Sequence, residues 1–339
     1  MKKIVVSGGK AALVEDMEPA LSDENPHRVL VRIKYSSISP GTELGLIHNP
    51  QIPDGFQLGY SGSGQVEAVG SAVRTVKPGD WVAVYGGPYV YHGEKLSVPE
   101  SLVMPLQSDR HLREAAYVGL GAVAVHSVRR MKLEFGETVW VVGLGFLGLL
   151  IAQICKNANY RVFATDMNPA RCELARAAGI VDVYAANDPM LDEHIDAFTA
   201  GHGFDAIALC AHSTKPGLIE QSMTKLAFRG TYALVGNVSI EFPRELFFQK
   251  EGDFVIARGA GPGRYDPQYE NDCIDYPKSY VRWTEGRNMQ EFIRQVEAGA
   301  LELDRLITHE FALDEAERAY EVLEREAGSA LGVLLRYGG

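Results

Sequence analysis

The sequence has few cysteines, no excess of positive charge and no long apolar run. Its four cysteines are widely spaced and form no C-x-x-C pair, which argues against a disulfide framework or a zinc knuckle. A formal net charge of -11 argues against a broad surface for nucleic acid or anionic membranes. No run of about 18 apolar residues is present, and the apolar stretch at the start is too short for a signal peptide. We therefore expect a soluble, cytoplasmic protein that binds neither nucleic acid nor membrane.

The composition that remains is typical of a globular enzyme. The 339 residues are 46% hydrophobic and 23% charged, and this length suggests two domains. Up to residue 112 the sequence consists of short strand-like runs separated by glycine and proline. The clearest of these runs lie at 28–35, 62–70 and 81–85. This first part predicts a compact β-rich domain.

Beyond residue 112 the pattern changes to helices that alternate with strands. Alanine-rich sequence at 113–130 predicts helices. Four buried strands are expected, at 138–142, 160–166, 204–210 and 230–236. Alternation of this kind indicates βαβ units and a parallel sheet. The stretch 259–288 has little periodicity and is interpreted as a long loop. Two helices and a strand are expected after it, at 289–299, 313–326 and 332–337.

A glycine-rich turn of the form G-x-G-x-x-G directly follows the first of these strands. Gly143 permits a tight turn, and Gly145 lets the backbone approach a pyrophosphate. Gly148 lets the next helix pack close to the strand, and the N-terminus of that helix faces the phosphates. Phe146 and Leu147 lie inside the same turn. The context of a strand before and an apolar helix after the turn predicts a dinucleotide site.

An acidic residue at the end of the next strand strengthens this prediction. Asp166 lies 23 positions beyond Gly143 and fits the carboxylate that binds the adenosine ribose hydroxyls. Because a carboxylate repels a 2′-phosphate, NAD is favoured over NADP, although Arg171 nearby could accept that phosphate. Further cofactor contacts are expected just after strand ends, at Met167, His212, Gly236 and Asn237. The alternative is a glycine turn of another α/β protein in which Asp166 only caps a helix.

The order of these features resembles the medium-chain dehydrogenase/reductase superfamily. The segments 306–316 and 76–82 are also similar to that superfamily, and the resemblance covers nearly the whole chain. It implies an α/β fold with a β-rich GroES-like catalytic domain at 1–115 and 287–339. A Rossmann domain with a doubly wound parallel sheet is then expected at 116–286 and would bind NAD.

Three motifs depart from the zinc-dependent members of that superfamily. Where those members resemble C-G-T-D, this chain has Pro40-Gly41-Thr42-Glu43, and their G-H-E corresponds to Gly59-Tyr60-Ser61. At the third position Gly119-Leu120-Gly121 has leucine in place of cysteine. A catalytic zinc needs three protein ligands, and the segment 85–104 also lacks the cysteines of a structural zinc lobe. The resemblance therefore implies no bound metal.

Other segments resemble a narrower zinc-independent group within the superfamily. They lie at 36–43, 261–266 and 280–285. Members of that group are often named together with bacteriochlorophyllide-type hydroxyethyl dehydrogenases, or they are found joined to sugar and inositol dehydrogenase-like domains. This resemblance implies a polyol or sugar-like small molecule as the substrate.

Without zinc, a side chain must exchange the proton of the alcohol. His92 has an imidazole suited to this near neutral pH, and Tyr60 stands at a lost ligand position. Thr42 resembles a proton-relay hydroxyl, and Glu43 flanks it. Three of these residues also have a structural interpretation: His92 as an exposed loop histidine, Tyr60 as a tyrosine that fills the space left by zinc, and Glu43 as a structural carboxylate.

Substrate contacts are expected from polar and aromatic residues that the resemblance places near the pocket. These are Ser39, Tyr85, Tyr91, Lys95, Arg264, Tyr265 and Trp283. Lys95 could instead be solvated. An arginine beside aromatic residues, as at 264–265, is equally typical of a subunit interface.

The leading hypothesis is a zinc-independent, NAD-dependent oxidoreductase that interconverts a secondary alcohol and a ketone on a sugar, cyclitol or related molecule. One alternative is an NAD(P)H-dependent quinone or enone reductase, since zinc-free members often reduce activated double bonds. Another is a non-catalytic protein that binds NAD(H). The resemblance further implies a homodimer or homotetramer formed through the nucleotide-binding domain.

Overall fold

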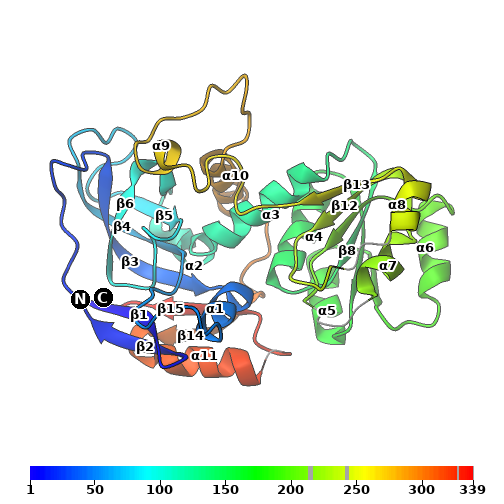
Figure 1. Cartoon of the computed structure of the whole chain (residues 1–339), viewed down its shortest axis with the longest axis horizontal. Helices are drawn as coiled ribbons and strands as arrows, with labels where there is room; N and C mark the ends of the chain where they lie inside the picture. The colour runs from blue at the N-terminus through cyan, green and yellow to red at the C-terminus, as the bar shows by residue number, and fades with distance from the viewer. Residues whose placement is uncertain (213–216, 241–243, 327, 339) are drawn as a thin grey trace. The chain divides into compact units, whose positions relative to one another are not determined.

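A computed structural model describes residues 1–212, 217–240, 244–326 and 328–338, and the chain forms two compact units (Figure 1). The first unit contains Met1–Ala122 and Ala260–Gly339, and the second contains Val123–Gly259. These divisions differ from the expected ones chiefly at 260–286. That segment belongs to the first unit because its side chains bond there, as when Arg264 donates to the carbonyl of Gly87.

The first unit is built on a mixed sheet whose strands run in the order β14-β15-β3-β4-β5-β7, with β6 paired to β3. The strands are β3 (Arg28–Ile38), β4 (Ser61–Val69), β5 (Trp81–Tyr85), β6 (Lys95–Pro99), β7 (Val103–Pro105), β14 (Ile307–Ala312) and β15 (Gly332–Arg336). The alternation that predicted β3 is confirmed, since Val29, Val31 and Ile33 are all in the core. Strand β15 lies between β14 and β3, so distant parts of the sequence share one sheet.

A hairpin and several helices surround this sheet. The hairpin consists of β1 (Lys2–Ser7) and β2 (Lys10–Glu15), and in Figure 1 it lies in blue beside the red helix α11. The helices of this unit are α1 (Pro40–Ile47), α2 (Leu112–Ala115), α9 (Pro267–Glu270), α10 (Glu285–Glu297) and α11 (Ala316–Arg325), with short 3-10 turns η1 (Glu100–Leu102), η2 (Asp109–His111) and η3 (Leu313–Glu315). Helix α3 (Val118–Arg130) begins in the first unit and continues into the second. None of the described helices is both long and apolar enough to span a membrane.

The second unit contains a parallel sheet in the order β10-β9-β8-β11-β12-β13. Its strands are β8 (Thr138–Val142), β9 (Arg161–Asp166), β10 (Asp182–Ala185), β11 (Phe204–Leu209), β12 (Leu226–Leu234) and β13 (Asp253–Ile256). The connecting helices are α4 (Phe146–Asn157), α5 (Pro169–Ala177), α6 (Leu191–Thr199), α7 (Leu218–Met223) and α8 (Arg244–Lys250). In chain order the strands lie 3-2-1-4-5-6, the order of a doubly wound Rossmann sheet. The predicted fold class is therefore confirmed.

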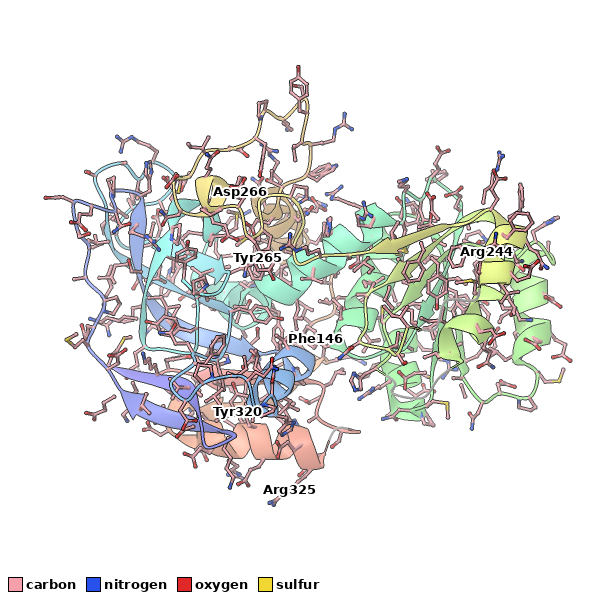
Figure 2. All side chains as sticks on the ribbon, viewed as in Figure 1. Phe146, Arg244, Tyr265, Asp266, Tyr320 and Arg325 are labelled. Atoms are coloured by element: carbon pink, nitrogen blue, oxygen red, sulfur yellow. The ribbon has the colours of Figure 1, made fainter. Side chains whose placement is uncertain are left out.

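The long loop expected at 259–288 is wrong in part, because the structure has helix α9 and the start of α10 within it. Both helices begin at polar caps. The Asp266 side chain accepts from the backbone N–H of Gln268, and Thr284 accepts from that of Arg287. Asp266 is labelled on this segment in Figure 2.

Candidate active site

The carboxyl ends of four neighbouring parallel strands bring the predicted cofactor residues to one edge of the second unit's sheet. Gly143 follows β8, Asp166 ends β9, and His212 and Gly236 lie shortly after β11 and β12. The strand order reverses between β8 and β11, and open α/β sheets bind ligands at such a reversal. His212 and the neighbouring Asn237 are exposed there, as is Met167.

The glycine turn has the geometry that a bound pyrophosphate needs. Gly143 has φ +96°, and a Cβ added to Gly148 would lie 1.9 Å from the carbonyl oxygen of Gly143. A Cβ added to Gly145 would meet no atom within 4 Å, so the turn is open at that point. Gly145 also precedes α4 without a side-chain cap, and the helix continues from Phe146. The free N–H groups of this helix start therefore fit a phosphate.

Asp166 ties the end of β9 to the glycine turn. Its carboxylate accepts the backbone N–H of Leu144 at 2.6 Å and that of Asn168 at 2.7 Å. Each carboxylate oxygen keeps a further lone pair, which can accept a ribose hydroxyl. The nearest Arg171 nitrogen lies 4.0 Å from the carboxylate. These residues together fit a dinucleotide.

Tyr60 lies in the first unit beside two small hydroxyl residues. Its ring is 5.8 Å from that of Tyr85, edge to face. Burial raises the pKa of Tyr60 to about 12, and the neighbouring hydroxyls of Ser39 and Thr42 partly oppose this rise. Those two hydroxyl oxygens are 3.5 Å apart. A Cβ added to Gly119 would come within 2.9 Å of both tyrosine rings, so the glycine is needed for this packing.

His92 is fully buried, which the sequence did not predict. Its Nε2 is 2.9 Å from a Glu43 oxygen, and its Nδ1 is 2.7 Å from the Ser36 hydroxyl, which in turn lies 2.8 Å from the Tyr337 hydroxyl. The residue is 0% exposed, and Gly59 packs against its ring. Because both ring nitrogens are engaged, the expectation that His92 itself exchanges the substrate proton does not fit this arrangement.

Glu43 is the centre of the same buried network. One carboxylate oxygen accepts the N–H of Ser39, the residue before α1, at 2.7 Å. The other accepts the hydroxyl of Tyr320, labelled on α11 in Figure 2, at 2.5 Å and faces His92. Burial raises the pKa of Tyr320 well above its usual value, and the charge of Glu43 adds to this. Glu43 and His92 therefore hold α1, which carries Thr42, and are positioning residues.

Arg264, Tyr265 and Tyr85 come together as a second aromatic group. The Arg264 guanidinium carbon lies 4.0 Å from the ring centre of Tyr265 and 5.5 Å from that of Tyr85. Arg264 also forms an ion pair with Glu270. Tyr85 also packs on the ring of Tyr60. The predicted substrate residues Tyr265, Arg264 and Tyr85 therefore form a series of contacts that ends at Tyr60.

Comparison with known proteins matches two parts of the chain to family models. Residues 25–127 match the family model of the alcohol dehydrogenase GroES-like domain, and residues 147–266 match that of the zinc-binding dehydrogenase. Together the two models cover more than half of the sequence. The chain belongs to the medium-chain dehydrogenase/reductase superfamily. Membership makes it an alcohol dehydrogenase-type oxidoreductase of an NAD(P)-dependent family.

Several members of the superfamily match this chain over nearly its full length. L-threonine 3-dehydrogenase of Rhizobium etli (strain CIAT 652) is 27% identical over 95% of both chains. Sorbitol dehydrogenase of Bacillus subtilis (strain 168) is 24% identical over 95% of this chain and 93% of its own. The structure of galactitol-1-phosphate dehydrogenase from Escherichia coli superposes with a TM-score of 0.80 at 20% identity, covering 99% of this chain and 100% of that one. This structural likeness shows the fold.

The residues at the superfamily's zinc-ligand positions do not fit the metal. Pro40 and Leu120 have no donor atom, and Tyr60 keeps its proton because of its raised pKa. Zinc takes thiolate, imidazole or carboxylate ligands. Within the described parts of the chain, no three His, Cys, Asp or Glu side chains lie close enough to share a metal ion.

Some predicted substrate residues are held by other partners. The Lys95 ammonium is 2.5 Å from Glu18 and 3.4 Å from Glu67, and the ammonium of Lys3 lies 6.0 Å from the ring centre of Tyr91. Trp283 is 38% exposed. The structure thus brings Ser39, Thr42, Tyr60, Tyr85, Arg264 and Tyr265 together, and it places Lys95 in a separate ion-pair cluster.

Sequence reasoning missed two buried carboxyl groups beside Arg264. Glu270 is 4% exposed and Glu285 is 0% exposed. Each lies at the end or start of a helix within the stretch interpreted as a loop. The only signal was local, since Asp266-Pro267 and Thr284-Glu285 are both typical helix starts.

Proposed function

We propose that this chain is an NAD-dependent oxidoreductase that interconverts a secondary alcohol and a ketone on a sugar, cyclitol or related polyhydroxylated molecule, without zinc. The observation that carries the proposal is the Tyr60 hydroxyl beside Ser39 and Thr42, at a position where zinc-dependent members have a metal ligand. The names of several relatives, such as sorbitol dehydrogenase and D-xylulose reductase A, support a polyol substrate.

Oxidation of an alcohol removes a hydride from carbon and a proton from oxygen. NAD, when bound, accepts the hydride. A side chain of the protein must then transfer the proton, and Tyr60 can do so. In alcohol oxidation the phenol accepts the alcohol proton and passes its own to Thr42 or Ser39, whose hydroxyl in turn releases a proton to solvent. In ketone reduction each transfer runs the other way, so the phenol donates its proton to the carbonyl oxygen and regains one from solvent through the same hydroxyls. Since its pKa is raised to about 12, Tyr60 holds a proton at neutral pH and is ready to act as the acid.

The choice of NAD over NADP rests on Asp166. Its carboxylate lies at the carboxyl end of β9, where it can accept ribose hydroxyls and would repel a 2′-phosphate. The nearest Arg171 nitrogen lies 4.0 Å from this carboxylate, so the negative charge of Asp166 partly neutralises the positive charge of Arg171. The same site could therefore admit NADP only if the carboxylate were removed.

Replacing Asp166 with asparagine is expected to weaken NADH binding about tenfold and to strengthen NADPH binding, because a charged hydrogen bond is worth about 1.5–3 kcal/mol. Fluorescence titration with each reduced cofactor measures both constants. Glu173→Gln, which removes an exposed carboxylate from α5, is the matched control and should change neither. Tighter NADPH than NADH binding by the unaltered chain contradicts the proposal.

The reaction is tested by following NADH absorbance while NAD and a panel of sugars, cyclitols and simple secondary alcohols are offered with a chelator present. Reduction of NAD by a polyol under these conditions supports the proposal. Activity that appears only after zinc is added contradicts the zinc-free mechanism. If no compound of the panel reduces NAD, an enone reductase is favoured and is tested next with NAD(P)H and activated alkenes. If that also fails, a protein that only binds NAD(H) is favoured.

We also propose self-association, as a homodimer or homotetramer, through the second unit. Strand β13 is at the edge of the parallel sheet, and Phe228, Phe248 and Ile256 are exposed on β12, α8 and β13. Light scattering is expected to give at least twice the mass of one chain. A particle with the mass of a single chain would exclude this proposal.

A further inference from the structure

A buried polar cluster beside Tyr85 has no part in the proton path described above. It contains one cation, Arg264, and two carboxyl groups, Glu270 and Glu285, all in the first unit. The three side chains are each at least nine-tenths buried. Burying three ionisable groups is costly unless each is paired, so the pairing pattern shows what the cluster does.

Glu270 is partnered through one carboxylate oxygen. That oxygen pairs with Arg264 and also accepts the backbone N–H of Tyr265 at 2.8 Å. Tyr265 has φ +69°, a left-handed conformation that is unfavourable for a residue other than glycine. Arg264 donates its other terminal nitrogen to the carbonyl of Gly87 at 2.8 Å. Glu270 therefore fixes both the guanidinium and the turn that carries Tyr265.

Glu285 differs from Glu270 because neither of its buried carboxyl oxygens has a hydrogen-bond partner among the described residues. The Nε of Arg264 is buried and unpartnered in the same way. The backbone of Glu285 is fixed, since its N–H donates to the carbonyl of Pro262 at 2.8 Å. An unpartnered carboxylate in this position would be strongly unfavourable, and a protonated carboxyl costs much less because it carries no charge.

The groups that face Glu285 come from four segments of the first unit. They are Glu270 and Tyr269 on α9, Arg264 before α9, Tyr276 after α9 and Tyr85 on β5. Burial raises the pKa of Glu285 to about 8, and the charge of Glu270 adds to this while Arg264 opposes it. At neutral pH the cluster then holds one cation, one anion and one neutral carboxyl, and its charges balance.

We propose that Glu285 holds a proton at neutral pH and is a positioning residue for the Tyr60 site, acting through Arg264 and Tyr85. The inference rests on the proposed role of Tyr60. When Glu285 releases its proton to solvent, its new carboxylate competes with Glu270 for the Arg264 guanidinium, because it can accept the unpartnered Nε–H of Arg264. The guanidinium then leaves its place 5.5 Å from the Tyr85 ring, and that ring in turn lies 5.8 Å from the ring of Tyr60.

The test compares Glu285→Gln with the unaltered chain in ketone reduction by NADH between pH 6 and 9.5. The amide keeps the shape of a protonated carboxyl and cannot ionise. We expect kcat/KM of the unaltered chain to fall as pH rises through about 8, and that of the variant to stay level over the same range. Glu291→Gln, a carboxylate on the outer side of α10 paired with Arg294, is the matched control and should keep the fall.

Thermal unfolding provides a readout that does not depend on turnover. The folded chain keeps a proton on Glu285 that the unfolded chain, with the ordinary carboxyl pKa of 4.5, has released. Stability of the unaltered chain therefore falls as pH rises from about 4.5 to 8 and then levels, and Glu285→Gln should remove this part of the fall. If the glutamine variant does not fold, Glu285→Met, which fills similar space without ionising, takes its place.

The outcomes separate this inference from the proposed function. Identical pH profiles of Tm for the variant and the unaltered chain overturn the assignment of a proton to Glu285. Loss of turnover at every pH, with NADH binding intact, overturns the positioning role and indicates direct contact with substrate. If the unaltered chain reduces no ketone, the proposed function fails, and the Tm profiles still decide whether Glu285 holds the proton.

Discussion

Replacing Tyr60 with phenylalanine is expected to lower kcat about 100-fold or more while leaving the dissociation constant of NADH unchanged, since a positioned acid contributes about 10²–10⁴-fold to rate. The substitution keeps the ring that packs on Tyr85 and Gly119 and removes only the hydroxyl beside Ser39 and Thr42. Steady-state ketone reduction at pH 7 and a fluorescence titration with NADH measure the two quantities.

The matched control is Tyr89→Phe, which removes a hydroxyl from a half-buried tyrosine of the same unit whose ring centre lies 4.6 Å from the guanidinium carbon of Arg28. It should leave kcat within twofold of the unaltered chain. A Tyr60→Phe variant with normal kcat would show that another group moves the proton.

Because Tyr60 is neutral below about pH 12, the rate of alcohol oxidation should also increase as pH rises, since the relay then loses its proton to solvent more easily.

Replacing Glu43 with alanine is expected to destabilise the first unit by about 3–5 kcal/mol, the usual result of removing one member of a buried ionic network. The change leaves the Tyr320 hydroxyl, the His92 Nε2 and the Ser39 N–H without their shared acceptor in the interior. Urea unfolding followed by intrinsic fluorescence measures the loss. NADH binding should persist to higher urea, because the second unit contains none of these residues.

Two comparison variants make the stability result specific. Glu317→Ala, on the exposed side of α11, should change the free energy of unfolding by less than about 0.5 kcal/mol. Glu43→Gln keeps an acceptor for Ser39 or Tyr320 and should cost less than alanine does. Equal, small effects of Glu43→Ala and Glu317→Ala would mean that the network does not support α1.

Local patterns in the sequence predicted four of the six strands of the Rossmann sheet, β8, β9, β11 and β12. The strands at 138–142 and 204–210 are mostly apolar, as strands buried on both faces are, and the glycine turn fixes where α4 begins. The hairpin β1–β2 carried no such signal. Helix α10 also begins earlier than periodicity indicated, because its first turn depends on the Thr284 cap and on Glu285, whose burial no local pattern reveals.

The candidate site was predictable as a set of motifs but not as a set of contacts. Tyr60 was found from a departure in a short motif, whereas Thr42 and Ser39 were expected from the resemblance, and the structure brings the three together. The enclosure of His92 depends on Ser36 and Glu43, which are 56 and 49 positions away, and on Tyr337 beyond them. Contacts over such separations follow from the folded sheet, so a histidine in a polar loop sequence could not be distinguished from an exposed one.

The pairing of β15 with β3 has a consequence for synthesis on the ribosome. Residues 123–259 form a continuous unit and can fold as soon as they emerge, whereas the sheet of the first unit lacks its central partner strand until 332–336 have been made. The Ser36 hydroxyl likewise waits for Tyr337, which is 301 residues later. The nascent chain can therefore carry a folded second unit while the first unit is still incomplete, and damage to the last strand removes partners of residues near the start of the sequence.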